Sequence, residues 1–219
     1  MTNRRPRGTP TGGQFAPGAR AEVDVDLGKS SIRTVRPDGT ERWYRNNQLH
    51  RENGPAMVLP DGTQEWYQNG LRHREGGPAV TRLDGYQAWY RRGRPHREDG
   101  PAVVYPDGSE DWCWGGKLHR EDGPASIRTD GHQAWYTKGK LHREDGPAVI
   151  YSDGSKSWFQ NDEYHRNDGP AIMRQDGYQA WLQHGRLHRE DGPAIIHPDG
   201  HEEWWQNGRR VDPPPSVPA

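Results

Sequence analysis

The sequence predicts an all-β protein, an elongated twisted antiparallel meander of stacked β-hairpins. Three interlocked series of residues predict this fold, because each recurs every 23 residues without an insertion. They are a His-Arg pair that begins at His50, an Asp-Gly pair that begins at Asp38, and a Trp. The Trp series is Trp43, Trp66, Trp89, Trp112, Trp135, Trp158, Trp181 and Trp204. Helical periodicity with caps is absent between residues 30 and 210, so each repeat is predicted to hold about two strands.

Residues 1–28 are predicted to be a disordered basic leader ahead of the array. They contain four Arg residues and no acid before Glu22. An apolar h-region is missing, so the start does not predict a secretory signal. The stretch from Gly8 to Ala16 resembles a short leader found ahead of many otherwise unrelated actinobacterial and mobile-element proteins, and this resemblance implies no activity.

Residues 29–211 are predicted to be the array of about eight repeats. Residues 105–109, Tyr-Pro-Asp-Gly-Ser, fit a type I turn that ends in a Gly at positive φ, as in a G1-bulge hairpin. The Asn69-Gly70 pair predicts a second hairpin turn. Residues 102–105 and 110–112 are short and rich in β-branched or aromatic residues, which is typical of strands. Between the repeats, Asp99-Gly100-Pro101 is expected to be a bend in which Gly100 supplies an unusual φ.

The C-terminal residues 212–219 are predicted to be a disordered tail, because three consecutive Pro residues cannot continue a sheet. A weaker period of 46 residues also runs through the array: Gln-Ala-Trp ends at Trp89, Trp135 and Trp181, and the intervening copies differ. Either a two-repeat unit was duplicated, or neighbouring repeats face different environments. A β-solenoid with one coil per repeat is the alternative fold, which would stack like residues about 4.8 Å apart instead of about 9.5 Å.

The segment from Trp66 to Gly70, followed by His73, a Gly and an Asp-Gly at a 23-residue step, resembles MORN repeats, and most of all the MORN-repeat variant. The resemblance covers residues 31–211. It departs where Arg-Glu-Asp lies between His96 and Gly100, since the family often has His-Gly there. It implies stacked β-hairpins in an elongated sheet. MORN proteins are generally scaffolds or binders, and some members of the variant are antitoxins, so the resemblance implies either role.

The recurring His-Arg-Glu-Asp group could indicate catalysis or metal binding, but a structural role is expected. Seven copies without a defined nucleophile exceed what one active site needs. His50 and His73 would lie about 9.5 Å apart, too far to share a zinc ion bound at about 2.0–2.1 Å. Arg97 and Glu98 are each expected to pair with the adjacent repeat. We therefore predict no catalytic, metal-binding or cofactor-binding residue.

Strand side chains alternate, so Trp66 and its neighbour Tyr67 should point to opposite faces. We expect the Trp series to be a structural ladder in the core. The second aromatic row is left over as a predicted partner-binding surface. This row is Tyr44, Tyr67, Tyr90, Tyr136, Phe159 and Trp205.

Composition restricts the possible partners. The 30 Lys and Arg residues balance 31 Asp and Glu residues, so nucleic acid is not an expected partner. No apolar stretch has the roughly 20 residues of a membrane span, and the single cysteine suits a cytoplasmic location. We expect a non-enzymatic scaffold that binds a protein. Self-association through edge strands or the aromatic face stays open, as do two other functions, an antitoxin or immunity protein and a binder of glycans or lipid headgroups.

Overall fold

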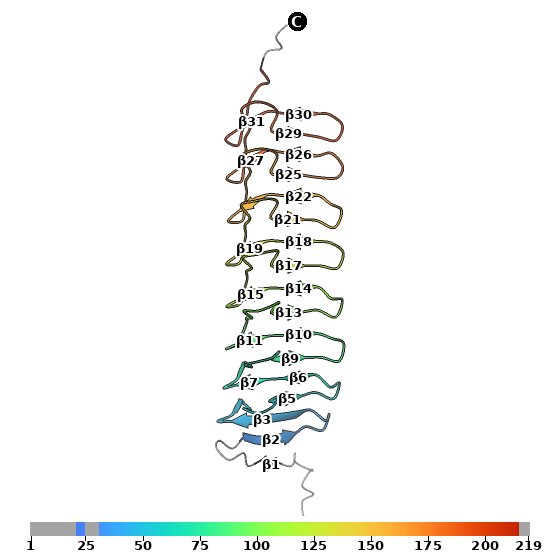
Figure 1. Ribbon diagram of the computed structural model, residues 1–219, viewed down its shortest axis with the longest axis vertical. Helices are drawn as coiled ribbons and strands as arrows, with labels where there is room; N and C mark the ends of the chain where they lie inside the picture. The colour runs from blue at the N-terminus through green and yellow to red at the C-terminus, as the bar shows by residue number, and fades with distance from the viewer. Residues whose placement is uncertain (1–20, 25–30, 215–219) are drawn as a thin grey trace, which may run out of the picture.

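A computed structural model describes residues 21–24 and 31–214, and these residues form the predicted all-β ladder (Figure 1). Each repeat adds two strands to one large antiparallel sheet whose strands follow one another in chain order. A second column of small hairpins lies beside this sheet along its whole length. The sequence predicted the hairpin turn of this column but not its separation from the main sheet, which raises the number of short strands per repeat from two to four. No helix in the described residues could cross a membrane.

The main sheet consists of the following strands, given in their order of pairing: β1 (Ala21–Asp24), β2 (Ser31–Val35), β3 (Glu41–Arg45), β5 (Met57–Val58), β6 (Gln64–Glu65), β9 (Val80–Thr81), β10 (Gln87–Ala88), β13 (Val103–Val104), β14 (Glu110–Asp111), β17 (Ser126–Ile127), β18 (Gln133–Ala134), β21 (Val149–Ile150), β22 (Lys156–Ser157), β25 (Ile172–Met173), β26 (Gln179–Ala180), β29 (Ile195–Ile196) and β30 (Glu202–Glu203).

The second column begins where β3 pairs with β4 (Gln48–Leu49). It continues as separate hairpins: β7 (Tyr67–Gln68) with β8 (Leu71–Arg72), β11 (Tyr90–Arg91) with β12 (Arg94–Pro95), β15 (Cys113–Trp114) with β16 (Lys117–Leu118), β19 (Tyr136–Thr137) with β20 (Lys140–Leu141), β23 (Phe159–Gln160) with β24 (Glu163–Tyr164), β27 (Leu182–Gln183) with β28 (Arg186–Leu187), and β31 (Trp205–Gln206) with β32 (Arg209–Arg210).

The Trp of each repeat is the junction between the two columns. The Trp112 backbone N–H donates to the carbonyl of Ala125 at 2.7 Å, and its own carbonyl accepts from the His119 N–H at 2.9 Å. These bonds pair the Trp backbone at the point where the chain leaves the main sheet. Ala125 is fully buried, as are its six counterparts in the other repeats. The Ala methyl groups are therefore fully covered where the two columns meet.

The turns at the outer edge of the main sheet confirm the predicted G1-bulge hairpins. Tyr105 N–H donates to the Ser109 carbonyl at 2.9 Å, Gly108 N–H donates to the Tyr105 carbonyl at 3.0 Å, and Gly108 has a φ of 86°. The Asp107 carboxylate accepts the Ser109 N–H at 2.9 Å. This bond keeps the pKa of Asp107 below its ordinary value. The turn geometry therefore explains why Asp-Gly recurs in every copy.

The hairpin turns of the second column place two consecutive residues at positive φ, as a type I′ turn requires. Asn69 and Gly70 have φ values of 50° and 77°, which confirms the predicted hairpin. Three copies carry a residue less suited to this conformation at the first position, namely Arg92, Lys138 and His184, with φ values of 50°, 52° and 48°. The stacked fold therefore imposes a left-handed conformation at these three positions.

The apolar core is thin, as expected of a chain with 29% hydrophobic residues. It consists of small clusters of Ala, Val and Ile, joined by Phe159 and Leu182 of the second column, on which partly buried aromatic side chains pack. One such cluster joins Val80, Ala88 and Val103 with Tyr86 and Tyr90. Stability must therefore also come from backbone pairing and from polar contacts that recur in each repeat.

The ends of the chain differ from the expectation at one point. Residues 21–24, assigned to the disordered leader, form β1, which pairs with β2 from Ala21–Thr34 to Asp24–Ser31. The remaining leader residues, and 215–219 of the predicted tail, lie outside the described residues. Residues 212–214 belong to no strand.

Candidate binding surface

The Arg of each His-Arg pair lies over the ring of the Trp eight residues before it. The distance from the guanidinium carbon to the ring centre is 3.8 Å for Arg120 on Trp112 and 4.1 Å for Arg97 on Trp89. All seven copies make this cation–π contact, at 3.8 to 4.1 Å. Each guanidinium also donates to the carbonyl of the Pro four residues later, as Arg143 does to Pro147 at 3.2 Å.

The Gly that follows this Arg by three residues faces the other side of the guanidinium. A Cβ at Gly100 would lie 2.8 Å from the Arg97 guanidinium carbon, and one at Gly192 would lie 2.6 Å from that of Arg189. The φ of Gly100 is not positive, so the expectation of an unusual φ there is wrong. A side chain at this position would displace the guanidinium, which lies between the indole ring and the glycine backbone.

The acids next to this Arg do not act as predicted. The Asp99 carboxylate accepts from Arg97 Nε within the same loop at 3.0 Å, and the Glu98 carboxylate lies 3.5 Å from His96 Nε2. Arg97 therefore pairs with its own loop and not with the adjacent repeat. It is the Arg97 backbone N–H that reaches the next repeat, where it donates to the Cys113 carbonyl at 3.2 Å.

The His residues also connect neighbouring repeats. His96 Nδ1 accepts a hydrogen bond from the backbone N–H of Gly115 in the next hairpin at 3.1 Å. Six of the seven copies make this bond, at 3.0 to 3.3 Å. His142 is the exception, because its Nδ1 has no partner and the facing turn is Asn161-Asp162. An Nδ1 that accepts from the backbone belongs to the neutral Nε2–H tautomer.

The seven segments between His and Pro form what we call the loop ridge. It consists of residues 51–54, 74–77, 97–100, 120–123, 143–146, 166–169 and 189–192. Its Arg side chains are largely covered, whereas its carboxylates project outward: the side chains of Glu121 and Asp122 are 91% and 84% exposed. The exposed surface of the ridge is therefore acidic, although the whole chain is almost neutral.

Two equivalent clefts lie between consecutive segments of the loop ridge. One cleft of about 720 Å³ is bordered by Asp168, Glu190 and Asp191, with Trp181 and Gln183 between them. The cleft one repeat earlier, of about 580 Å³, has Trp158 and Gln160 in the corresponding places. In both clefts an indole, an amide and several carboxylates therefore converge beside two Arg side chains and a His, and the two clefts are one repeat apart.

The second aromatic row does not form the exposed surface that the sequence suggested. Phe159 is buried, and Tyr90 and Tyr136 pack against the core clusters. Tyr67 donates to the Glu65 carboxylate at 2.6 Å, and Trp205 Nε1 donates to that of Glu203 at 3.1 Å. Tyr44 is half-buried. Binding of a partner through this row stays a prediction.

The Trp ladder is also less buried than expected. Trp43 is 5% exposed, whereas the other seven Trp residues are half-buried, and six of these are covered on one face by Arg. The sequence carries a signal for this stack, because Trp, Arg and Gly keep the same spacing in all seven copies. The spacing alone does not show that the three residues are in contact, since they lie in different segments of the repeat.

Alternate repeats present different residues to the core face of the sheet. The position before the Trp is Ala88, Ala134 and Ala180 in alternate copies, and Glu65, Asp111, Ser157 and Glu203 in the copies between them. Asp111 accepts from the Tyr105 hydroxyl at 2.8 Å and from Arg128 at 2.9 Å. The 46-residue period therefore corresponds to two alternating environments.

In the part of the chain that the structure describes, no group of three His, Cys, Asp or Glu side chains is placed to hold a metal ion. Cys113 is buried, and burial raises the pKa of its thiol to about 11. No protein-family model matches the chain, and no curated protein is similar to it.

Proposed function

We propose that this protein is a non-enzymatic scaffold that binds a partner protein along its loop ridge. The observation that carries the proposal is the pair of equivalent clefts between consecutive ridge segments, each bordered by exposed carboxylates and a Trp. Such a surface suits a partner with Lys or Arg side chains, because opposite charges attract and a Trp edge contacts their apolar stems. The resemblance of the repeat to MORN repeats, generally scaffolds or binders, supports the same function.

The spacing of the ridge suggests the conformation of the bound segment. Two strands per repeat separate equivalent carboxylates by about 9.5 Å. A polyproline II helix advances about 3.1 Å per residue with three residues per turn, so every third side chain lies on the same side, about 9.3 Å apart. An extended segment with a basic residue at every third position would place one cation in each cleft. We therefore propose that the partner presents such a segment.

A structural role for the His residues supports a scaffold more than an enzyme. A catalytic His must exchange a proton, and a ring that accepts the backbone N–H of the next repeat has one nitrogen already engaged. The same arrangement recurs in six copies, which suits a stacking contact between repeats. The proposal therefore assigns the His residues to the scaffold and the exposed acids to binding.

A capture experiment tests this proposal. The intact protein is compared with a variant in which Glu121, Asp122, Glu144 and Asp145 are replaced by Gln or Asn, and with a control that carries Glu163→Gln and Glu202→Gln, exposed acids outside the ridge. We expect the ridge variant to lose the captured partner and the control to retain it. Removal of residues 1–28 should leave capture unchanged. Equal capture by the ridge variant would contradict the proposal.

A further inference from the structure

A second candidate site lies beside the Asp-Gly turns of the main sheet. No residue of the loop ridge lines it. In one two-repeat unit, Tyr105 and Arg128 both bind the carboxylate of Asp111, at 2.8 and 2.9 Å. The residues 46 positions later are Tyr151, Ser157 and Arg174. The Tyr and the Arg are therefore kept in this later unit, whereas Ser replaces the acid that they would share.

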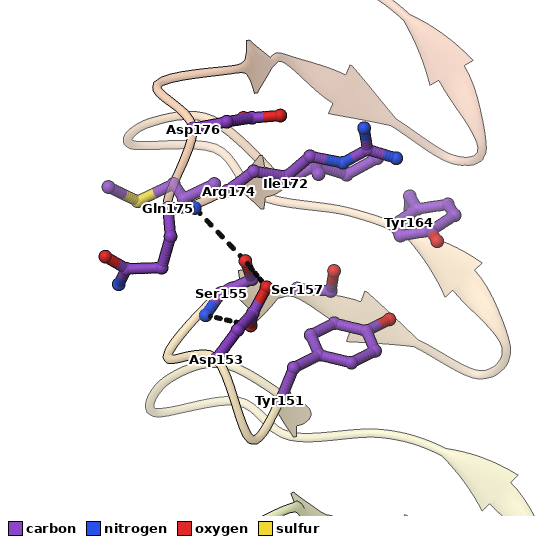
Figure 2. A pocket seen from close by; sticks show the side chains of 10 residues that line it. Tyr151, Asp153, Ser155, Ser157, Tyr164, Ile172, Arg174, Gln175 and Asp176 are labelled. Atoms are coloured by element: carbon purple, nitrogen blue, oxygen red, sulfur yellow. Dashed lines mark hydrogen bonds between the residues drawn. The ribbon is translucent and has the colours of Figure 1, made fainter.

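A cavity of about 600 Å³ lies at this position. Figure 2 shows the side chains of Arg174 and Tyr151 above and below the same space, with Ser157 between them and Tyr164 across from them. Among the described residues, none places a carboxylate within ion-pair distance of the Arg174 guanidinium. The guanidinium carbon lies 5.0 Å from the centre of the Tyr178 ring. A cationic group and a hydroxyl thus face an open cavity that holds a carboxylate in the sister unit.

The two acids that line the cavity are engaged elsewhere. The Asp153 carboxylate accepts from the Ser155 N–H at 2.8 Å and from its hydroxyl at 2.9 Å, as the dashed lines in Figure 2 show for this turn. The Asp176 carboxylate accepts from the Tyr178 N–H at 2.9 Å. Both acids belong to Asp-Gly turns and point to their own backbone, so they leave the Arg174 guanidinium available.

The other residues that line the cavity indicate which kind of chemical group would carry a carboxylate bound there. Ile172 pairs with Ser157 across the sheet, whereas the corresponding partner of Asp111 is the smaller Ser126. Tyr164 and Met173 complete an apolar side of the cavity. A bound carboxylate would therefore have an apolar or aromatic group against these side chains.

We propose that Tyr151, Ser157 and Arg174 form a binding site for a carboxylate carried on an apolar or aromatic group. Arg presents paired N–H donors that match the two oxygens of a carboxylate, and such charge-assisted bonds are short and strong. The short Ser157 side chain leaves space for the two oxygens of a bound carboxylate. In the sister unit, Asp111 supplies carboxylate oxygens at the same position. The same Tyr and Arg pair thus stabilises the fold in one unit and binds a ligand in the other.

The test measures the binding of sodium phenylacetate to the full chain. Binding is detected as changes in the NMR chemical shifts of the backbone amides between residues 172 and 178. Sodium chloride at equal ionic strength and neutral phenylacetamide are the controls. We expect a saturable response to phenylacetate alone. Ser157→Asp should abolish it by restoring the internal acid, and Arg174→Gln, at an exposed position, should weaken it at least tenfold without unfolding the chain. Arg128→Gln, in the sister unit, should leave binding unchanged.

Two further measurements extend this experiment. Asp111→Ser should create a second site and raise the stoichiometry from one to two. A tripeptide that ends in Phe, with a free or an amidated C-terminus, separates a polypeptide terminus from a small organic acid as the source of the carboxylate. An equal response to phenylacetate and chloride would overturn the proposal, as would undiminished binding by both the Ser157→Asp and Arg174→Gln variants.

Discussion

The guanidinium of Arg120 lies over the indole ring of Trp112, with its carbon 3.8 Å from the ring centre. Gly123 closes the other side, since a Cβ there would lie 3.0 Å from the same carbon. A partly desolvated cation–π contact contributes about 0.5–2 kcal/mol. Seven such contacts, one for each His-Arg pair, add polar stabilisation to a core that has few aliphatic side chains.

Gly192→Ala tests whether the glycine is needed for space. Its Cβ would lie 2.6 Å from the Arg189 guanidinium carbon, whereas at Gly146 the corresponding distance is 3.2 Å. We expect Gly192→Ala to cost about 1–3 kcal/mol of unfolding free energy, and Gly146→Ala to cost less, as measured by urea denaturation. The double variant Arg189→Ala with Gly192→Ala should recover most of the cost of the added methyl. Additive losses would show that the two residues do not compete for the same space.

Lys138→Asn should stabilise the protein. Lys138 has a φ of 52° at the first position of its type I′ turn, where the corresponding residue of an earlier repeat is Asn69. Asn adopts this left-handed conformation at lower cost, so we expect a gain of up to about 1 kcal/mol in unfolding free energy. Thr137→Asn, one residue earlier and outside the left-handed region, is the matched control and should give no gain. A loss of stability with Lys138→Asn would contradict the turn assignment.

The sequence predicted the parts of this fold that depend on local turn chemistry. Asp107-Gly108 and Asn69-Gly70 need positive φ values at defined positions, so their residues indicate both hairpins directly. The separation of the second hairpin from the main sheet was missed, because its strands are two residues long and begin immediately after the Trp, without a turn signal between. The contact of Tyr105, Asp111 and Arg128 joins three segments of two repeats, and no local pattern indicates it.

The stability of the protein should decrease below neutral pH in part through His50. This side chain is 3% exposed, and its burial, together with nearby Arg45, lowers its pKa below the ordinary value of 6.5. The folded state thus favours the neutral ring, and the stabilisation that results is complete above pH 6.5. This stabilisation is lost as the pH falls from 6.5 to the lowered pKa. Below the lowered pKa, the stability no longer changes through His50.

Urea midpoints measured between neutral pH and about pH 5 test this prediction. The decrease should be smaller in His50→Gln, which cannot take up the proton. His119, whose side chain is 19% exposed, gives a comparison variant, His119→Gln. If His50→Gln loses as much stability on acidification as the unmodified protein, the assigned role of His50 is wrong.

Removal of one whole repeat should leave a folded, shorter protein. Deletion of residues 120–142 keeps every His-Arg, Asp-Gly and Trp in phase, and repeat arrays depend mainly on contacts between neighbours. Deletion of residues 120–129 destroys the phase and should unfold part of the array. Circular dichroism and urea titration distinguish the two. The same behaviour for both deletions would contradict the array model.

The affinity of the loop ridge for synthetic peptides tests the proposed function most directly. One peptide has Arg at every third residue among prolines, and a second has the same number of Arg residues at every fourth. Because about 9.3 Å between Arg residues matches the spacing of about 9.5 Å between repeats, the first peptide should bind at least about tenfold more tightly. Its binding should weaken between about 50 and 200 mM salt. Equal affinity for both peptides, or affinity that the ridge variant retains, would contradict binding in register along the ridge.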